Sequence, residues 1–114
     1  MRSVRCLSLA GLMLACALPA QAEVPRVVAD LPSVSALVQQ VMGDLGRPET
    51  LLQAGADPHD YQLRPSQARS LQEADLLVRI GPEMTPWLEH ASAGLAANAT
   101  ALTLLDLPGT HRQD

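Results

Sequence analysis

The chain has 114 residues, with twelve acidic side chains against eight arginines and no lysine. This length allows one modest hydrophobic core. An acidic chain with one Trp, one Tyr and no Phe lacks both the charge that neutralises phosphates and the aromatic platforms on which bases stack. Composition therefore argues against a nucleic-acid partner, and the lack of a basic amphipathic helix argues against binding to a membrane surface.

The first 22 residues have the three parts of a secretory signal peptide. Arg2 and Arg5 give a positive start, residues 7–18 form an apolar run, and Ala-Gln-Ala at residues 20–22 matches a cleavage site. The apolar run is too short to remain as a membrane span. We expect cleavage after residue 22, export to the periplasm, and no membrane insertion of residues 23–114. A lipidated N-terminus at Cys16 is the alternative, although the residues after it are still apolar.

Cleavage would remove both cysteines, Cys6 and Cys16. The mature chain would then have no disulfide and no thiolate metal ligand, although it enters an oxidising compartment. It would keep six arginines against the twelve acidic residues, a net charge of −6.

The first half of the mature chain predicts two strands and a helix. Residues 24–29 are rich in valine and favour a strand, residues 32–45 favour a helix, and residues 50–53 favour a second short strand. In the helix, apolar residues recur at the spacing of one face, which we expect to be buried. That face consists of Val34, Leu37, Val38, Val41, Met42 and Leu45.

The second half continues the alternation of helix and strand. We expect helices over residues 65–74 and 83–97, and strands over residues 76–80 and 101–107. Pro65 suits the first turn of its helix, and the apolar strand at residues 76–80 suits burial on both faces. The predicted inward positions of the two helices are Ala68, Leu71 and Ala74, then Met84, Trp87, Leu88, Ala91 and Leu95.

This alternation predicts an α/β fold, a parallel four-stranded sheet with helices on both faces. Ligands of such sheets bind beyond the carboxyl ends of the strands. The loop at residues 55–65 follows the carboxyl end of the second predicted strand. It therefore lies where this architecture places binding sites.

The loop at residues 55–65 also holds the densest polar chemistry of the chain, with His59 between Asp57 and Asp60. Neutral imidazole is the commonest protein ligand for zinc, and a carboxylate often holds its second ring nitrogen. A plain turn is the alternative, because glycine and Asp-Pro are ordinary turn residues. The position at the sheet edge favours a metal site with His59 as a ligand. One histidine does not complete such a site, since zinc takes about four ligands.

The other candidate residues are weaker. His90 lies off the apolar stripe of its helix and is expected to be solvated, and His111 lies in a polar tail. Trp87 is expected in the core. Arg79, within an apolar strand, is expected either to mark the end of that strand or to pair with an acidic neighbour.

The sequence gives no support for catalysis. It contains no glycine-rich phosphate loop and no Gly-x-Ser-x-Gly turn. A dyad of Asp57 and His59 would have no nucleophile beside it. We therefore predict a binding protein and not an enzyme.

Residues 55–66, Gly-Ala-Asp-Pro-His-Asp-Tyr-Gln-Leu-Arg-Pro-Ser, resemble the metal-binding loop of the cluster 9 solute-binding proteins, which serve bacterial ABC importers of zinc and manganese. The resemblance continues through residues 71–76 and 80–84 and covers essentially all of 24–108. It implies that His59 is the first zinc ligand, while Asp60 and Tyr61 shape the loop. It also implies that zinc is the transported cargo and that an ABC permease in the inner membrane is the partner.

The resemblance further implies two α/β lobes joined by a long helix, with the metal between them and the other ligands supplied from later in the chain. Residues 23–114 would then be the N-terminal lobe of a truncated chain, and a second chain could supply the missing lobe. The alternative is an exported remnant that acts as a small interaction or structural domain without transport. Zinc and manganese both remain open, because the ligands that decide between them are not in this sequence.

Overall fold

The computed structural model describes residues 21–113, so the predicted signal peptide lies almost wholly outside the described residues. Within them, none of the helices is long and apolar enough to cross a lipid bilayer. The elements, in chain order, are β1 (Val27–Ala29), α1 (Pro32–Met42), the 3-10 turn η1 (Gly43–Leu45), β2 (Glu49–Thr50), α2 (Pro65–Gln72), β3 (Leu76–Arg79), α3 (Pro86–Leu95), β4 (Thr100–Thr103) and the 3-10 turn η2 (Leu104–Asp106).

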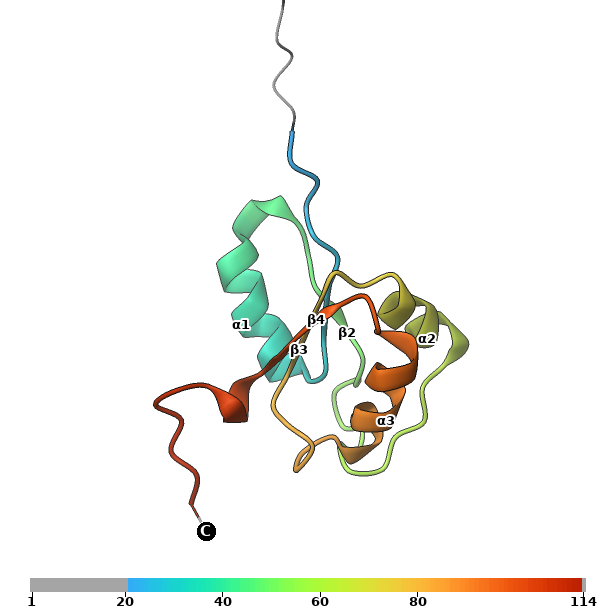
Figure 1. Cartoon of the computed structure of the whole chain (residues 1–114), viewed down its shortest axis with the longest axis vertical. Coiled ribbons are helices and arrows are strands. Elements are labelled where there is room, and N and C mark those ends of the chain that lie inside the picture. The colour runs from blue at the N-terminus through green and yellow to red at the C-terminus, as the bar shows by residue number, and fades with distance from the viewer. Residues whose placement is uncertain (1–20, 114) are drawn as a thin grey trace, which may run out of the picture.

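The four strands form one sheet in the order β2-β1-β3-β4, and all three pairings are parallel. Val28 of β1 is opposite Glu49 on one side and Leu77 on the other, and Leu77 is opposite Ala101 of β4. Parallel neighbours need a crossover connection, which each helix supplies. The predicted α/β fold with a parallel four-stranded sheet is confirmed (Figure 1).

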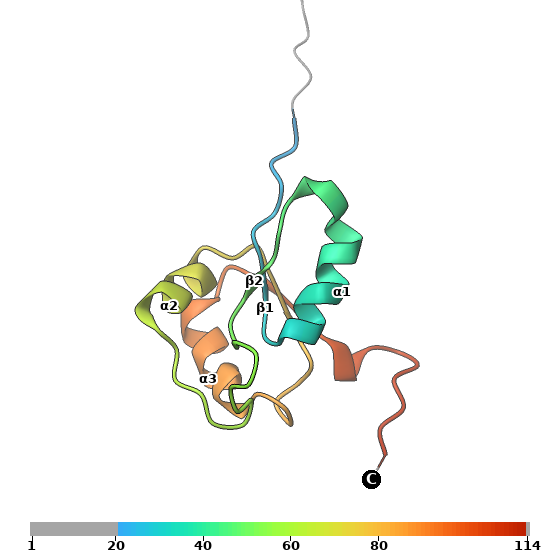
Figure 2. The same ribbon diagram turned by 180° about the vertical axis from the view of Figure 1, so that it is seen from behind.

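The helices lie on both faces of the sheet, as predicted (Figures 1 and 2). α1 covers one face, where Val27, Val34 and Val78 pack together. α2 and α3 contact each other on the opposite face, over a larger cluster that contains Val28 and Leu77. Successive strand residues thus point to opposite faces, and the sheet is apolar on both.

Several predicted boundaries differ from those of the structure, and three of the differences have a visible cause. The second strand pairs only over Glu49–Thr50, although Leu51 continues the ladder through its N–H to the Ala29 carbonyl at 2.9 Å. The third helix begins at Pro86 because the preceding residues form a turn, closed by the Thr85 N–H on the Gly81 carbonyl. The fourth strand ends at Thr103, where η2 begins.

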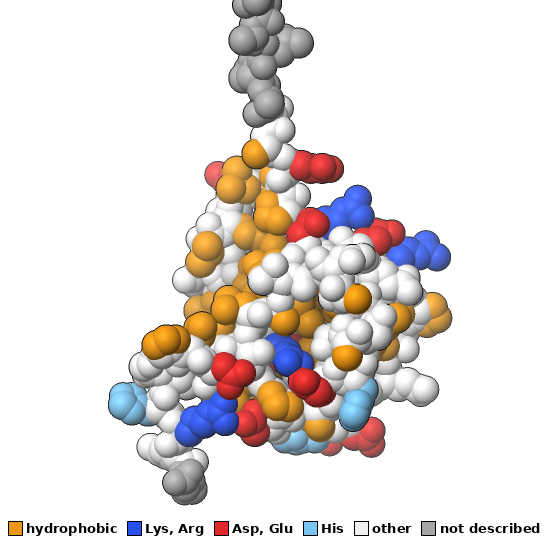
Figure 3. All heavy atoms as spheres, in the orientation of Figure 1, with side chains coloured by type: hydrophobic (Ala, Val, Ile, Leu, Met, Phe, Trp, Pro, Cys, Tyr) orange, Lys and Arg blue, Asp and Glu red, His pale blue; other side chains and the backbone are white. Residues whose placement is uncertain are grey.

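The predicted burial of the α1 face is correct only in part: Val38 and Met42 pack, partly buried, beside Val34, but the other three residues of the face are exposed. Val34 is only 2% exposed, whereas Leu37 is 58%, Leu45 73% and Val41 88% exposed. α1 itself ends at Met42, because Gly43 has a positive φ of 56°. Apolar spacing identifies which face of a helix is apolar, but it does not identify what covers that face. Figure 3 shows hydrophobic side chains gathered on this side of the molecule, over and beside α1.

The two valines of α1 provide a matched test of this packing. Val34→Ala removes buried methyl groups next to the sheet and should lower the free energy of unfolding by about 2 kcal/mol. Val41→Ala removes the same groups from a side chain that is 88% exposed, so the change should stay within about 0.5 kcal/mol. Urea denaturation followed by circular dichroism measures both. Equal losses for the two variants would contradict the packing described for α1.

Candidate metal site

The buried side chain of Gln67 holds the loop at residues 55–65 against the body of the domain. Its amide oxygen accepts hydrogen bonds from the Tyr61 hydroxyl at 3.1 Å and the Arg64 N–H at 2.9 Å. Its amide nitrogen donates to the Leu51 carbonyl at 2.6 Å. Gln67 therefore binds both Leu51, which precedes the loop, and Arg64, near the end of the loop. The two ends of the loop are held together by this one side chain of α2.

The tip of the loop is held from α3. The Trp87 indole N–H donates to the Pro58 carbonyl at 2.8 Å, and the His59 N–H donates to the Asp57 carboxylate at 2.9 Å. The rings of Tyr61 and Trp87 lie 5.3 Å apart at 51°, a tilted contact that adds to the attachment. His59 itself is exposed. The loop therefore carries the imidazole into solvent on a backbone that is fixed from behind.

The carboxyl edge of the sheet contains a buried carboxylate that was not predicted from the sequence. Asp30 directly follows β1 and is fully buried. It accepts hydrogen bonds from the N–H groups of Leu31 at 2.8 Å and Ile80 at 2.9 Å, and a longer one from the Thr85 hydroxyl at 3.4 Å. Burial raises the pKa of Asp30 above its ordinary value, and these hydrogen bonds offset part of the effect. The available signal was an acidic residue directly after an apolar strand.

Asp30→Asn should lower the free energy of unfolding by about 1–3 kcal/mol, because an amide cannot accept from both buried N–H groups. The size of this loss should depend on pH. A raised pKa means that the folded chain holds the Asp30 proton more tightly than the unfolded chain. The stability gained this way is complete below about pH 4 and is lost as the pH rises through the raised pKa.

The difference in unfolding free energy between the wild type and Asp30→Asn should therefore narrow as the pH rises from about 4 toward 7. Urea titrations at intervals across this range measure that difference directly. A difference that widens with pH would mean that the folded environment favours the ionised carboxylate.

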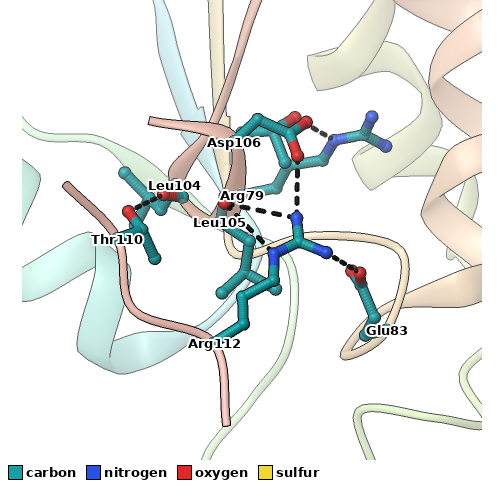
Figure 4. Close-up of polar contacts among 8 residues, drawn as sticks. Arg79, Glu83, Leu104, Leu105, Asp106, Thr110 and Arg112 are labelled. Carbon is teal, nitrogen blue, oxygen red and sulfur yellow. Dashed lines mark hydrogen bonds and ion pairs between the residues drawn. The ribbon is translucent and has the colours of Figure 1, made fainter. Parts of the chain in front are cut away.

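Arg112 of the C-terminal segment contacts residues that follow the carboxyl ends of β3 and β4 (Figure 4). The Arg112 guanidinium lies between two carboxylates, at 2.7 Å from Glu83 and 2.8 Å from Asp106, and it donates to the Leu105 carbonyl. Glu83 follows β3 and Asp106 follows β4. The ion pairs are exposed, so they order the segment more than they stabilise the fold.

The other residues considered in the sequence lie where they were expected. The hydrogen bond from Trp87 to Pro58 is the one contact among them that was not expected. His90 is exposed on α3, and His111 is exposed in the C-terminal segment. Arg79 ends β3 and pairs with Glu89 of α3 at 2.7 Å. Trp87 packs against the core only in part, and its bond to Pro58, which joins residues 29 apart, was not predicted.

Among residues 21–113 no group of three or more His, Cys, Asp or Glu side chains is placed to hold a metal ion. The loop backbone that carries His59 is held in place by hydrogen bonds, but the described residues do not supply a full set of metal ligands around it. Such a loop can supply one imidazole to a metal whose other ligands come from elsewhere.

Comparison with known proteins identifies the family. Residues 27–113 match the family model described as ZnuA, zinc-uptake complex component A, periplasmic. A high-affinity zinc uptake system protein ZnuA from Paracoccus denitrificans is 68% identical over 108 residues, which is 95% of this chain and 33% of that protein. The chain belongs to the ZnuA family of metal solute-binding proteins, and it spans about a third of the length of such relatives.

Solved structures agree with this assignment. A Mn-bound periplasmic metal-binding protein from Candidatus Liberibacter asiaticus superposes with a TM-score of 0.65 at 26% identity, over 72% of this chain and 31% of that one. Zn(II)-bound AdcA from Streptococcus pneumoniae superposes with a TM-score of 0.60 at 25% identity, over 69% of this chain and 17% of that one. The fold described above is thus that of periplasmic metal-binding proteins.

Proposed function

We propose that residues 23–114 form the N-terminal lobe of the zinc-binding component of a bacterial ABC importer, exported to the periplasm by a signal peptide at residues 1–22. The lobe binds zinc through His59 and delivers it, within a complete two-lobe site, to a membrane permease. It captures and releases its cargo and catalyses no reaction. Either the continuation of a longer chain or a second chain supplies the other lobe.

The observation that carries this proposal is the way the loop presents His59. An exposed imidazole stands at the carboxyl edge of a parallel sheet, on a backbone held by Gln67 and Trp87. Ligand sites of open α/β sheets lie at this edge. The names of the relatives, a zinc uptake protein and Zn- and Mn-bound binding proteins, support the same cargo class.

Zinc titration against a chromophoric chelator tests the proposal. Cys6→Ser and Cys16→Ser should be present throughout, so that thiols of any retained N-terminal segment do not bind the metal. We expect the protein to bind zinc weakly through His59, with water completing the shell, and His59→Ala to abolish this binding. Binding should also weaken as the pH falls, because a protonated imidazole cannot bind metal.

The matched control is His90→Ala, which removes an exposed histidine from α3 and should leave the titration unchanged. Zinc binding that survives in His59→Ala would contradict the assignment of the ligand. Repeating the titration with manganese shows which cargo the loop prefers; an imidazole ligand favours zinc.

A second candidate function is an exported interaction domain without transport, and the exposed face of α1 favours it. Leu37, Val41 and Leu45 border an apolar groove that Leu102 and Leu104 of β4 and η2 also line. A second copy of the chain is the occupant that this reading requires, because burial of apolar surface drives association.

Sedimentation velocity distinguishes the second candidate from the first. If the chain acts as an interaction domain, the wild type should dimerise at micromolar concentration, and Val41→Glu should remain monomeric with unchanged stability. A wild type that stays monomeric at high concentration would contradict this second candidate, because the exposed face of α1 would then bind no second copy.

A further inference from the structure

We propose that Trp87 and Asp57 are positioning residues for His59, acting together on the peptide group that joins Pro58 to His59. The inference rests on the proposed function, because the positioned imidazole matters only if it binds metal. Neither residue reaches the metal in this role. Each holds one end of the same rigid backbone unit.

The two hydrogen bonds meet on one peptide plane. The carbonyl of this group belongs to Pro58 and accepts from the Trp87 indole at 2.8 Å. Its N–H belongs to His59 and donates to the Asp57 carboxylate at 2.9 Å. Because a peptide group is planar and rigid, holding both its oxygen and its N–H restrains the orientation of the whole unit.

Restraining this unit restrains the position of the His59 Cα, from which the side chain extends. Asp57 comes from within the loop, whereas Trp87 comes from α3 on the body of the domain. The hydrogen bond to Asp57 shapes the tip of the loop, and the hydrogen bond from Trp87 attaches the tip to α3. The ring contact between Tyr61 and Trp87 restrains the indole further. A ligand that is already oriented loses less freedom when the metal binds, which raises affinity.

The two residues should respond differently to conservative change. Trp87→Phe keeps an aromatic ring against Tyr61 but removes the donor to Pro58, so zinc affinity should fall about fivefold to tenfold. Asp57→Asn keeps a carbonyl oxygen that accepts from the His59 N–H, so its affinity should stay within about twofold of the wild type. Asp57→Ala removes the acceptor, and its affinity should fall about threefold to fivefold because this bond is exposed.

The Asn and Ala variants separate positioning from charge. If Asp57 acted only as a negative charge near the cation, Asn would weaken binding as much as Ala. If it acts as the acceptor for the His59 N–H, Asn restores the affinity that Ala loses. This pattern of rescue is what a merely structural or electrostatic role would not produce.

The experiment is competitive zinc titration of the purified protein and these variants, with amide hydrogen exchange at His59 measured by NMR. Exchange at His59 should be faster in Trp87→Phe and Asp57→Ala than in the wild type, without metal present. Leu95→Ala serves as the control for stability, because Leu95 packs against the same core from α3 and does not touch the loop in any of the contacts above. Its zinc affinity and its His59 exchange should match the wild type.

Weaker zinc binding and faster His59 exchange in Trp87→Phe, with Asn rescuing position 57, would support the inference. Unchanged affinity in Trp87→Phe, while His59→Ala still abolishes binding, would overturn it and leave the proposed function intact. A loss in Leu95→Ala equal to that in Trp87→Phe would also overturn it, because stability alone would then explain the effect. A wild type that binds no zinc would overturn both proposals.

Discussion

The parallel pairing of β1 with a strand on each side is the constraint on which the rest of this fold depends. β1 has only three residues, all buried, yet its carboxyl end is bonded to both neighbours. The Asp30 N–H donates to Val78, the Asp30 carbonyl accepts from Leu52, and the Asp30 carboxylate accepts from Ile80. One residue therefore joins the ends of three strands. The His59 loop begins directly beyond this junction, so its base is set by the centre of the sheet.

Much of the architecture was predictable because it is recorded in local patterns. Alternating apolar runs predicted four parallel strands and three crossover helices, and all were found. The loop at residues 55–65 was recognisable because its histidine, carboxylates and turn residues are consecutive in the chain. The assignment of His59 as a metal ligand remains a prediction, since nothing in the described residues completes a site around it.

What the sequence could not predict depends on contacts between distant residues. No spacing rule connects Trp87 to Pro58, and a lone Asp30 after an apolar strand gives little sign of its bonds to Ile80 and Thr85. The burial predicted for the apolar face of α1 was wrong at Leu37, Val41 and Leu45 for a related reason. The spacing of the apolar residues correctly identified one face of the helix. Spacing carries no information about how much of that face the sheet covers. Val34 meets the sheet, whereas Val41, two turns further on, extends past it.

The contact between Tyr61 and Trp87 has a spectroscopic consequence. These are the sole tyrosine and the sole tryptophan of the chain, which contains no phenylalanine. Their rings lie 5.3 Å apart, beside the peptide group that carries His59. All aromatic fluorescence of the protein therefore originates from this one pair of rings, one in the loop and one in α3, and excitation of Tyr61 can pass directly to Trp87. The emission therefore reports on the surroundings of this pair of rings, so the protein carries its own optical probe beside the backbone of His59.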